Sequence, residues 1–142
     1  MPPKKLAVLE TDGWAVATAG AKQAFAAATA KLTAAGIRLT TRHDDPRVAA
    51  VESAIERSRD FSTAINAWEW RWPINTYRAR DAGKLSKATL DRGAQAEAMT
   101  LDDYRRHIAD RDRRRAIHQE LAADFDACMT LTAPGAAPGG LG

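Results

Sequence analysis

The first 41 residues place one helical pattern between two short apolar runs, and this order constrains the fold more than any other feature. KKLAVLE (residues 4–10) is bounded by turn residues, as buried strands often are. After the turn TDGW, residues 18–36 predict a helix that Thr18 caps and Gly36 ends. IRLTT (residues 37–41) alternates like a half-buried strand. Strand, helix and strand in about 40 residues predict a βαβ unit with parallel strands and a right-handed crossover.

Helical patterns dominate the rest of the chain. Asp45 as N-cap and Pro46 in the first turn predict a helix that continues to Trp72, where Pro73 ends or kinks it. Ser86 can cap a short helix that ends at Leu90. These patterns predict two helices separated by the loop DAGKLS.

A long helix and a third strand complete the prediction. Thr100 and Asp103 fit a capping pattern for a helix that extends to Phe125, and DACMTLT (residues 126–132) predicts the strand. The predicted fold class is therefore α/β, helix-rich, with a small and mostly parallel sheet. We expect one domain over residues 1–142, of which residues 135–142 form a flexible tail.

Composition sets the expected environment. Hydrophobic residues make up 45% of the chain and charged residues 27%, which is typical of a soluble globular protein. The single cysteine, Cys128, excludes an internal disulfide, and its apolar neighbours predict a small buried side chain. The sequence has neither a signal-peptide core nor a run of about 18 apolar residues. We therefore predict a cytoplasmic protein without a membrane partner.

Positive charge is concentrated in one stretch near the C-terminal end. The net charge is +3, and six arginines lie close together: Arg105, Arg106, Arg111, Arg113, Arg114 and Arg115. Four aspartates lie among them: Asp102, Asp103, Asp110 and Asp112. This spacing favours a solvated helix face with ion pairs over a basic RNA-binding surface, so no nucleic-acid partner is predicted.

No constellation of side chains predicts a reaction by itself. The four serines (Ser53, Ser58, Ser62 and Ser86) lie in predicted helices or at a helix cap, and none is in a Gly-rich loop. The three histidines (His43, His107 and His118) lack metal-ligand spacing, and there is no cysteine pair. We therefore predict no catalytic residue, no metal site and no cofactor.

The aromatic segment AWEWRW (residues 67–72) admits two interpretations. Its tryptophans could line a pocket, but core packing is the favoured interpretation. Glu69 could act as an acid, but the favoured role is to face solvent or to pair with Arg71.

The chain resembles part of the amidase-signature family, and four pieces carry the resemblance. KKLAVLETDGWAVATAGAKQAF is similar to the strand, turn and helix that follow the family's catalytic core. AWEWRWPINTYRARDAGKLS is similar to a helix that leads into a Leu-Ser loop. AMTLDDYRRHIADRDRRRAIHQELAADF resembles a long helix rich in Tyr and Arg, and the following DACMTLTAPGAAPGGLG resembles an apolar strand with a Thr-x-x-Pro-like exit.

The resemblance implies a truncated enzyme. The family hydrolyses amides with a Ser–cis-Ser–Lys triad, but this sequence contains neither the Gly/Ser-rich loop nor the matching lysine. It therefore resembles a later-middle segment without the catalytic half, inactive alone and enzymatic only when completed. At most, the family implies that Thr132, Ala133 and Pro134 border the substrate site, as does the Trp-bearing helix.

Two interpretations of the role follow. In the first, the chain is an amidase fragment or truncated homologue whose partner is a complementing amidase segment. In the second, it is a non-catalytic interaction or dimerisation module derived from an amidase, which uses an exposed face to bind a second copy or another partner.

Overall fold

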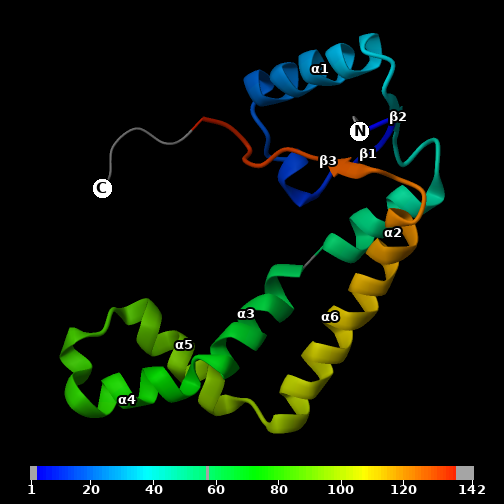
Figure 1. Ribbon diagram of the computed structural model, residues 1–142. Helices are drawn as coiled ribbons and strands as arrows, with labels where there is room; N and C mark the ends of the chain where they lie inside the picture. The colour runs from blue at the N-terminus through cyan, green and yellow to red at the C-terminus, as the bar shows by residue number, and fades with distance from the viewer. Residues whose placement is uncertain (1–2, 57, 137–142) are drawn as a thin grey trace. The chain divides into compact units, whose positions relative to one another are not determined.

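A computed structural model describes residues 3–56 and 58–136 (Figure 1). The chain divides into two compact units. The α/β unit comprises Met1–Glu56 and Ala116–Gly142, and the helical unit comprises Arg57–Arg115. The single domain over residues 1–142 stays a prediction. Of the predicted tail over residues 135–142, residues 137–142 lie outside the described residues.

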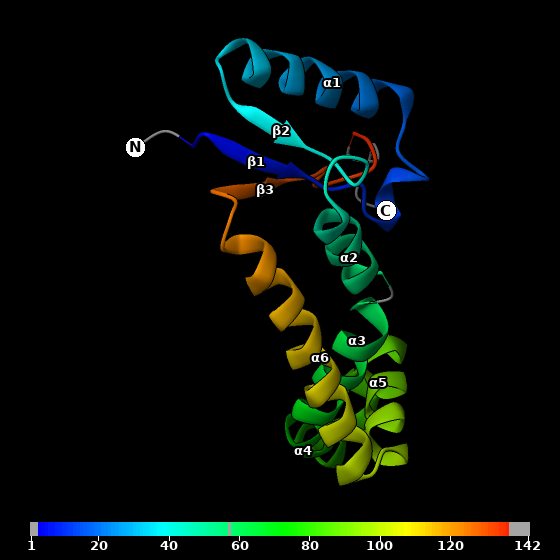
Figure 2. The same ribbon diagram turned by 90° about the vertical axis from the view of Figure 1, so that its right-hand side faces the viewer.

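The α/β unit contains a parallel sheet of three short strands. These are β1 (Lys5–Val8), β2 (Arg38–Thr40) and β3 (Ala127–Met129), and β1 lies in the middle (Figure 2). Leu6 pairs with Leu39 on one side, and Ala7 pairs with Cys128 on the other. The described chain is thus helix-rich α/β with a small parallel sheet, as predicted.

Helix α1 (Ala19–Ala34) connects β1 to β2 after a short 3-10 turn, η1 (Asp12–Trp14). Thr18 Oγ1 accepts from the Ala21 N–H at 3.2 Å, which confirms the predicted cap. Gly36 has φ of 81°, a left-handed conformation that glycine adopts without strain. Both predicted ends of this helix are therefore confirmed.

Helix α2 (Pro46–Ile55) follows β2 and starts as predicted. The Asp45 carboxylate accepts from the backbone N–H of Arg47 at 2.9 Å and also binds the Arg47 guanidinium. These hydrogen bonds lower the pKa of Asp45 to about 2. Pro46 occupies the first turn, where its missing N–H costs no helical hydrogen bond.

The core of the α/β unit lies on one face of the sheet. In Figures 1 and 2, α1 lies over one face, while α2 and the last turns of α6 (Leu101–Ala122) lie over the other. Alternate β1 residues point to opposite faces. The core cluster comprises Ala7, Leu9, Val48, Val51, Leu121 and Phe125.

Asp126 connects the starts of β1 and β3. Its Oδ2 accepts from the backbone N–H groups of Lys4 at 2.7 Å and Lys5 at 2.9 Å. The hydrogen bond from Lys4, and then that from Lys5, lowers the pKa of Asp126. The aspartate before the predicted third strand therefore fixes the alignment of two strands that are far apart in sequence.

We predict that Asp126→Asn lowers the Tm of the α/β unit by about 4 to 8 °C at pH 7, because charge-assisted hydrogen bonds are lost. The folded-state pKa lies below the unfolded value of about 3.9. The stabilisation that the ionised Asp126 carboxylate provides is therefore complete above the unfolded-state pKa, and it is lost as the pH falls through the folded-state pKa. Thermal melts of both proteins should converge at low pH, whereas equal Tm values at pH 7 would contradict the prediction. Asp91→Asn, in an exposed pair with Lys87, is the control.

Two sequence predictions about β3 are wrong. The strand covers Ala127–Met129 rather than residues 126–132, because its ladder to β1 spans only three residue pairs. Cys128 is exposed, since β3 is an edge strand and the helices do not cover its side chain. Partial burial nevertheless raises the pKa of the Cys128 thiol.

The predicted single helix from Asp45 to Trp72 is also wrong. The structure has α2, then α3 (Ser58–Glu69), then α4 (Arg71–Asp81). Glu56 leaves the helical region with ψ of 134°, which ends α2. The helix breaks at Trp70, three residues before Pro73, so that α3 ends at Glu69 and Pro73 lies in the first turn of α4.

The helix capped by Ser86 is longer than predicted. Ser86 Oγ accepts from the Thr89 N–H at 3.3 Å, but α5 runs over Lys87–Ala98 instead of ending at Leu90. A short 3-10 turn, η2 (Ala82–Lys84), connects it to α4. Gly93 of α5 is buried against α4, where an added Cβ would lie 2.9 Å from Ile74 Cγ2. The glycine therefore permits the close approach of the two helices.

We predict opposite effects for two glycine-to-alanine substitutions. Alanine favours a helix over glycine by about 1 kcal/mol, but at Gly93 overpacking against Ile74 costs about 1 to 3 kcal/mol. Gly93→Ala should therefore destabilise the helical unit by about 1 kcal/mol. Gly20→Ala, in α1 with open space around it, should stabilise by about 0.5 kcal/mol. Urea unfolding followed by circular dichroism measures both, and a stabilising Gly93→Ala would refute the packing argument.

Helix α6 begins with the predicted capping box. The Thr100 N–H donates to Asp103 Oδ2 at 2.8 Å, and the Asp103 N–H donates to Thr100 Oγ1 at 3.1 Å. The predicted ion-paired face is also confirmed. Along the helix, Asp102 pairs with Arg105, Asp103 with Arg106, Asp110 with Arg113 and Arg114, and Asp112 with Arg111.

Candidate functional site

The topology of the sheet indicates where the α/β unit can bind a ligand. The carboxyl ends of parallel strands meet at one edge of a sheet, and ligands bind outside that edge where the strand order reverses. Here β2 lies on one side of β1 and β3 on the other, so the reversal occurs at β1. The edge is formed by the residues that follow the strands: Glu10 after β1, Thr41 after β2 and Thr130 after β3.

A cavity of about 410 Å³ lies at this edge, and we call it the carboxylate cavity. Its lining comes from the loop after β1, from the loop after β2 and from α2. The lining residues are Glu10, Thr11, Asp12, Trp14, Ala15, Arg42, Ala49, Glu52, Ser53 and Glu56.

Glu52 is the buried ionic group of the carboxylate cavity. Its side chain is only 7% exposed, and its Oε1 accepts from the Glu10 N–H at 2.6 Å. Its Oε2 lies 2.8 Å from Arg42 Nε, outside good hydrogen-bond alignment, so this contact is an ion pair. Arg42 Nη2 also donates to the Glu10 carbonyl at 2.9 Å. Glu52 and Arg42 thus fix the backbone just after β1.

Carboxylates outnumber cationic side chains in the lining of the cavity. Arg42 pairs with Glu52 at 2.8 Å and also lies 3.9 Å from Glu10 Oε2, while Asp12 and Glu56 add further carboxylates. The cavity therefore favours cationic and hydrogen-bond-donating groups over anions. Among residues 3–56 and 58–136, no group of three or more His, Cys, Asp and Glu side chains is arranged to hold a metal ion.

The three sequence-predicted site residues lie elsewhere on the α/β unit. Thr132, Ala133 and Pro134 are exposed and line neither the carboxylate cavity nor the groove described below. The Pro134 carbonyl accepts from the Thr18 N–H at 2.7 Å. An added Cβ on Gly135 would lie 2.9 Å from Thr18 Cγ2. The segment after β3 therefore packs against the start of α1.

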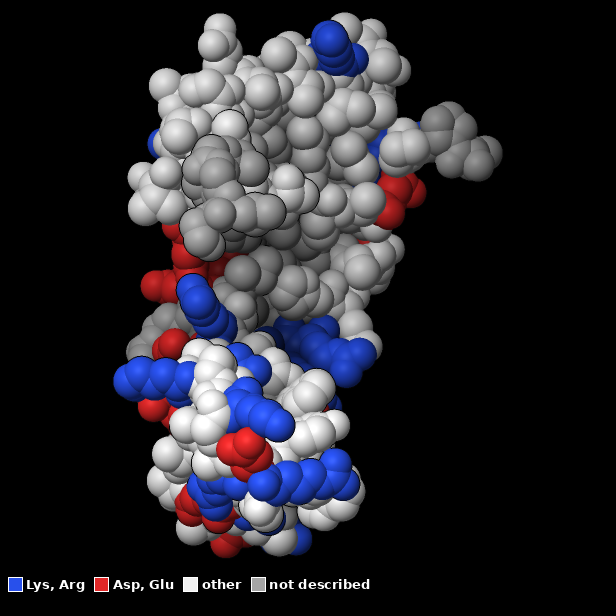
Figure 3. Space-filling view, turned by 90° about the vertical axis from the view of Figure 1, so that its left-hand side faces the viewer, with Lys and Arg blue, Asp and Glu red and all other residues white. Residues whose placement is uncertain are grey.

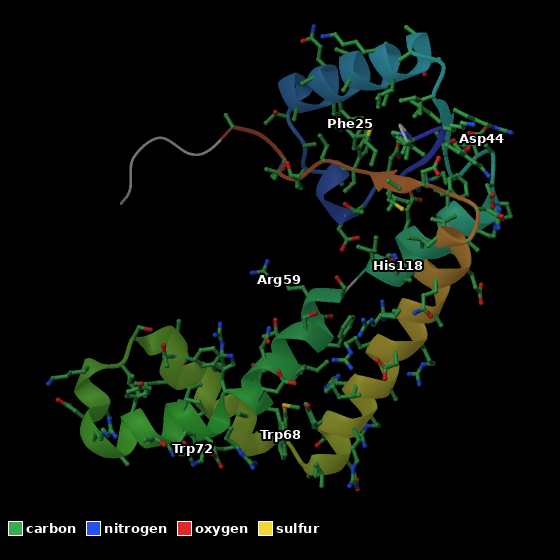
Figure 4. All side chains as sticks on the ribbon, viewed as in Figure 1. Phe25, Asp44, Arg59, Trp68, Trp72 and His118 are labelled. Atoms are coloured by element: carbon green, nitrogen blue, oxygen red, sulfur yellow. The ribbon has the colours of Figure 1, made fainter. Side chains whose placement is uncertain are left out.

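A second recess, which we call the α1 groove, has a volume of about 740 Å³. Phe25 points from α1 towards the sheet and packs edge-on against Trp14, with ring centroids 5.2 Å apart (Figure 4). The small alanines of α1 leave open space beside this contact. The lining residues are Val8, Glu10, Trp14, Lys22, Phe25, Ala26, Thr29, Ala30, Thr33, Ala34, Leu39 and Thr41.

In the helical unit, the aromatic segment is divided between the interior and the surface. Trp68 stacks on Tyr104 at 5.5 Å, and Arg71 lies 4.1 Å from the Trp68 ring centroid. Trp70 and Trp72 are instead 57% and 77% exposed, so the core-packing prediction is wrong for these two.

Glu69 has a partner that sequence reasoning missed. The Tyr104 hydroxyl donates to Glu69 Oε1 at 3.0 Å, whereas we expected Glu69 to face solvent or to pair with Arg71. This hydrogen bond raises the pKa of the Tyr104 phenol. The contact joins α3 to α6 inside the helical unit and gives Glu69 a structural role.

The described residues show no hydrogen bond between a serine and a lysine. Ser86 caps α5, Ser58 and Ser62 lie on α3, and Ser53 lines the carboxylate cavity. Sequence reasoning missed Glu52 and Arg42. A signal was present for Glu52, since it shares a helix face with Val48, Val51 and Ile55, where an acid is unexpected.

No helix in the described parts of the chain combines the length and the hydropathy that a membrane crossing requires. Comparison with protein-family models, with curated proteins and with solved structures gives no match for this chain.

Proposed function

We propose that this chain is a non-catalytic segment of an amidase-signature hydrolase, which forms part of the substrate-binding edge and acts only with a complementing catalytic segment. One observation carries the proposal. Two pieces of the family resemblance, far apart in sequence, lie side by side: β1 pairs with β3, and Pro134 hydrogen-bonds Thr18 at 2.7 Å. The Thr132–Pro134 segment follows the carboxyl end of β3, on the side of the sheet where α/β proteins bind ligands, and this supports the proposal although the segment lines neither recess.

The open sheet supports the same proposal. Both β2 and β3 are edge strands, and each pairs with β1 over only three residues. Such edges offer unpaired N–H and C=O groups to another strand. A complementing segment that continued the sheet would satisfy these groups.

The chemistry of the described residues supports a binding role. Amide hydrolysis requires a nucleophile activated by a base, together with donors that stabilise the oxyanion. Ser53 is the serine at the carboxylate cavity, and its neighbours there include Glu52 and Arg42 but no lysine or histidine. The carboxylates that line this cavity accept hydrogen bonds, so they suit the positioning of a substrate group that donates one, such as an amide or amine N–H.

The proposal is tested with the purified chain and simple aliphatic and aryl amides. We expect no ammonia or amine release above the buffer rate, because within residues 3–56 and 58–136 no serine hydrogen-bonds a lysine or histidine. The control is the same chain purified through a second, unrelated column. Turnover that co-purifies with the chain through both columns would refute a non-catalytic role.

A second candidate function is an interaction or dimerisation module. The exposure of Trp70 and Trp72 favours it, because tryptophan is enriched among residues that dominate binding energy at protein interfaces. The two candidates differ in the partner: a catalytic segment in the first and a second copy in the second.

A further inference from the structure

Two exposed aromatic side chains lie on the same side of helix α4. The Trp70 carbonyl accepts from the Ile74 N–H at 3.0 Å, so helical geometry already holds at Trp70. Tyr77 follows seven residues later, which places it about 20° around the helix axis from Trp70 and about 10 Å along it. Trp70 and Tyr77 are 57% and 56% exposed. Their rings are therefore two separate aromatic surfaces on one side of the helix.

A recess with two cationic side chains continues this side of the helix beyond Tyr77. Its volume is about 450 Å³, and its lining residues are Tyr77, Arg80, Asp81, Lys84 and Leu85. Arg80 lies 5.9 Å from the Tyr77 ring centroid and forms no ion pair with any carboxylate in residues 3–56 and 58–136. Lys84 pairs with Asp81 at 3.6 Å, but exposed pairs of this kind are weak. We call Trp70, Tyr77, Arg80 and Lys84 the α4 face.

Positive charge is more one-sided around the α4 face than along α6. Residues 70–85 contain four Lys and Arg against one Asp, a formal charge of +3. Helix α6 contains six Arg against five Asp and Glu, a formal charge of +1. The prediction of no nucleic-acid partner depended on the interleaved charges of α6, which the region around α4 does not share. Figure 3 shows Lys and Arg gathered over the helical unit on the face in view.

Exposed rings beside cationic groups fit one class of polyanion, a single strand of nucleic acid. Proteins that bind such strands stack the bases on aromatic rings and place cationic groups along the phosphates. A duplex offers no free base to a ring, because its bases stack on one another. Aromatic anchors of protein interfaces lie in closely packed pockets, whereas the recess at Tyr77 does not extend to Trp70.

We propose that the α4 face binds single-stranded nucleic acid. Two bases stack on the rings of Trp70 and Tyr77, and phosphates of the same strand pair with Arg80 and Lys84. All four residues belong to the helical unit, so the contact needs no residue of the α/β unit. The binding is independent of amide hydrolysis and goes beyond the proposed function.

Fluorescence anisotropy with a labelled RNA of about 12 nucleotides and mixed sequence tests the proposal on the whole purified chain. We expect saturable binding at about 100 mM salt. An abasic strand of the same length keeps the phosphates but offers no base to stack. Its Kd should therefore be at least about tenfold higher than that of the RNA.

Single substitutions in the α4 face should weaken binding in different ways. Trp70→Ala and Tyr77→Ala should each raise the Kd about fivefold or more, because one stacked base loses its ring. Trp70→Phe keeps a ring and should restore most of the affinity. Arg80→Ala should raise the Kd and reduce the slope of log Kd against log salt concentration by about one, because one phosphate contact is lost.

Trp72 provides a matched control for the two aromatic substitutions. It lies on the same helix (Figure 4) and is 77% exposed, but it is about 140° around the helix axis from Tyr77. Trp72→Ala should therefore change the Kd by less than about twofold, since no base stacks on that side. Circular dichroism checks the helical content of every variant.

Three results would overturn the proposal. The first is equal affinity for the RNA and the abasic strand, which would mean that the rings do not contact bases. The second is an equal loss of affinity in Trp72→Ala and Tyr77→Ala, which would place the strand elsewhere. The third is no RNA binding at about 100 µM protein, where even non-specific binding is measurable. Self-association that Trp70→Ala abolishes, found together with that third result, would assign the α4 face to a second copy. These measurements involve no amide substrate, so they leave the proposed function to its own test.

Discussion

Replacing Glu52 by alanine should destabilise the α/β unit by about 3 kcal/mol, the lower end of the range for breaking a buried ion pair. The substitution removes the acceptor of the Glu10 N–H and leaves Arg42 without its close carboxylate. The lower end applies because the Arg42 side chain is only partly buried. Urea unfolding followed by circular dichroism measures the change in the free energy of unfolding.

Three further variants show whether the ion pair is responsible. Glu52→Gln keeps an acceptor for the Glu10 N–H but loses the charge, so it should destabilise less than Glu52→Ala. A double-mutant cycle with Arg42→Ala should give a coupling energy of about 1 to 3 kcal/mol. Asp102→Ala breaks an exposed pair with Arg105 and should change stability by less than about 0.5 kcal/mol. If Asp102→Ala and Glu52→Ala lowered the free energy of unfolding equally, the interpretation of Glu52 and Arg42 as a stabilising buried pair would be contradicted.

Leu121→Ala should cost about 3 to 4 kcal/mol, the largest effect expected from a single truncation in this chain. Leu121 is 1% exposed and packs with the core cluster between the sheet, α2 and the end of α6. Truncation removes apolar contacts and leaves a cavity that the short strands cannot easily close. The lost stability should be visible as a lower urea midpoint for the α/β unit.

The same helix contains a matched control. Leu101, at the start of α6, is roughly half exposed, and Leu101→Ala should cost less than about 1 kcal/mol. A Leu121→Ala variant as stable as Leu101→Ala would mean that the end of α6 does not pack on the sheet.

Local sequence features predicted the ends of several elements. The side chains of Thr18, Asp45, Ser86 and Thr100 each accept from a backbone N–H that a helix start leaves unpaired, so the residue type itself carries the information. The first two strands and the parallel topology also followed from the spacing of apolar runs and from the helix between them.

Features that depend on non-local contacts could not be predicted in this way. Nothing in the periodicity of residues 45–72 marks the end of α2 at Glu56 or the break between α3 and α4 at Trp70. The exposure of Trp70 and Trp72 depends on tertiary contacts that this periodicity does not show. The ion pair of Glu52 with Arg42 joins α2 to the loop after β2, and only the fold brings these side chains together. The amidase relationship and the roles of Thr132–Pro134 stay predictions.

Complementation is the most direct test of the proposed amidase role. The chain is co-expressed with a polypeptide that carries the Gly/Ser-rich loop and upstream lysine of an amidase-signature enzyme. We predict a stable complex that releases ammonia from simple amides, no release by either part alone, and loss of activity when the loop serine of the partner is replaced by alanine. Failure of the two polypeptides to associate, or equal activity of the partner without this chain, would contradict the proposal.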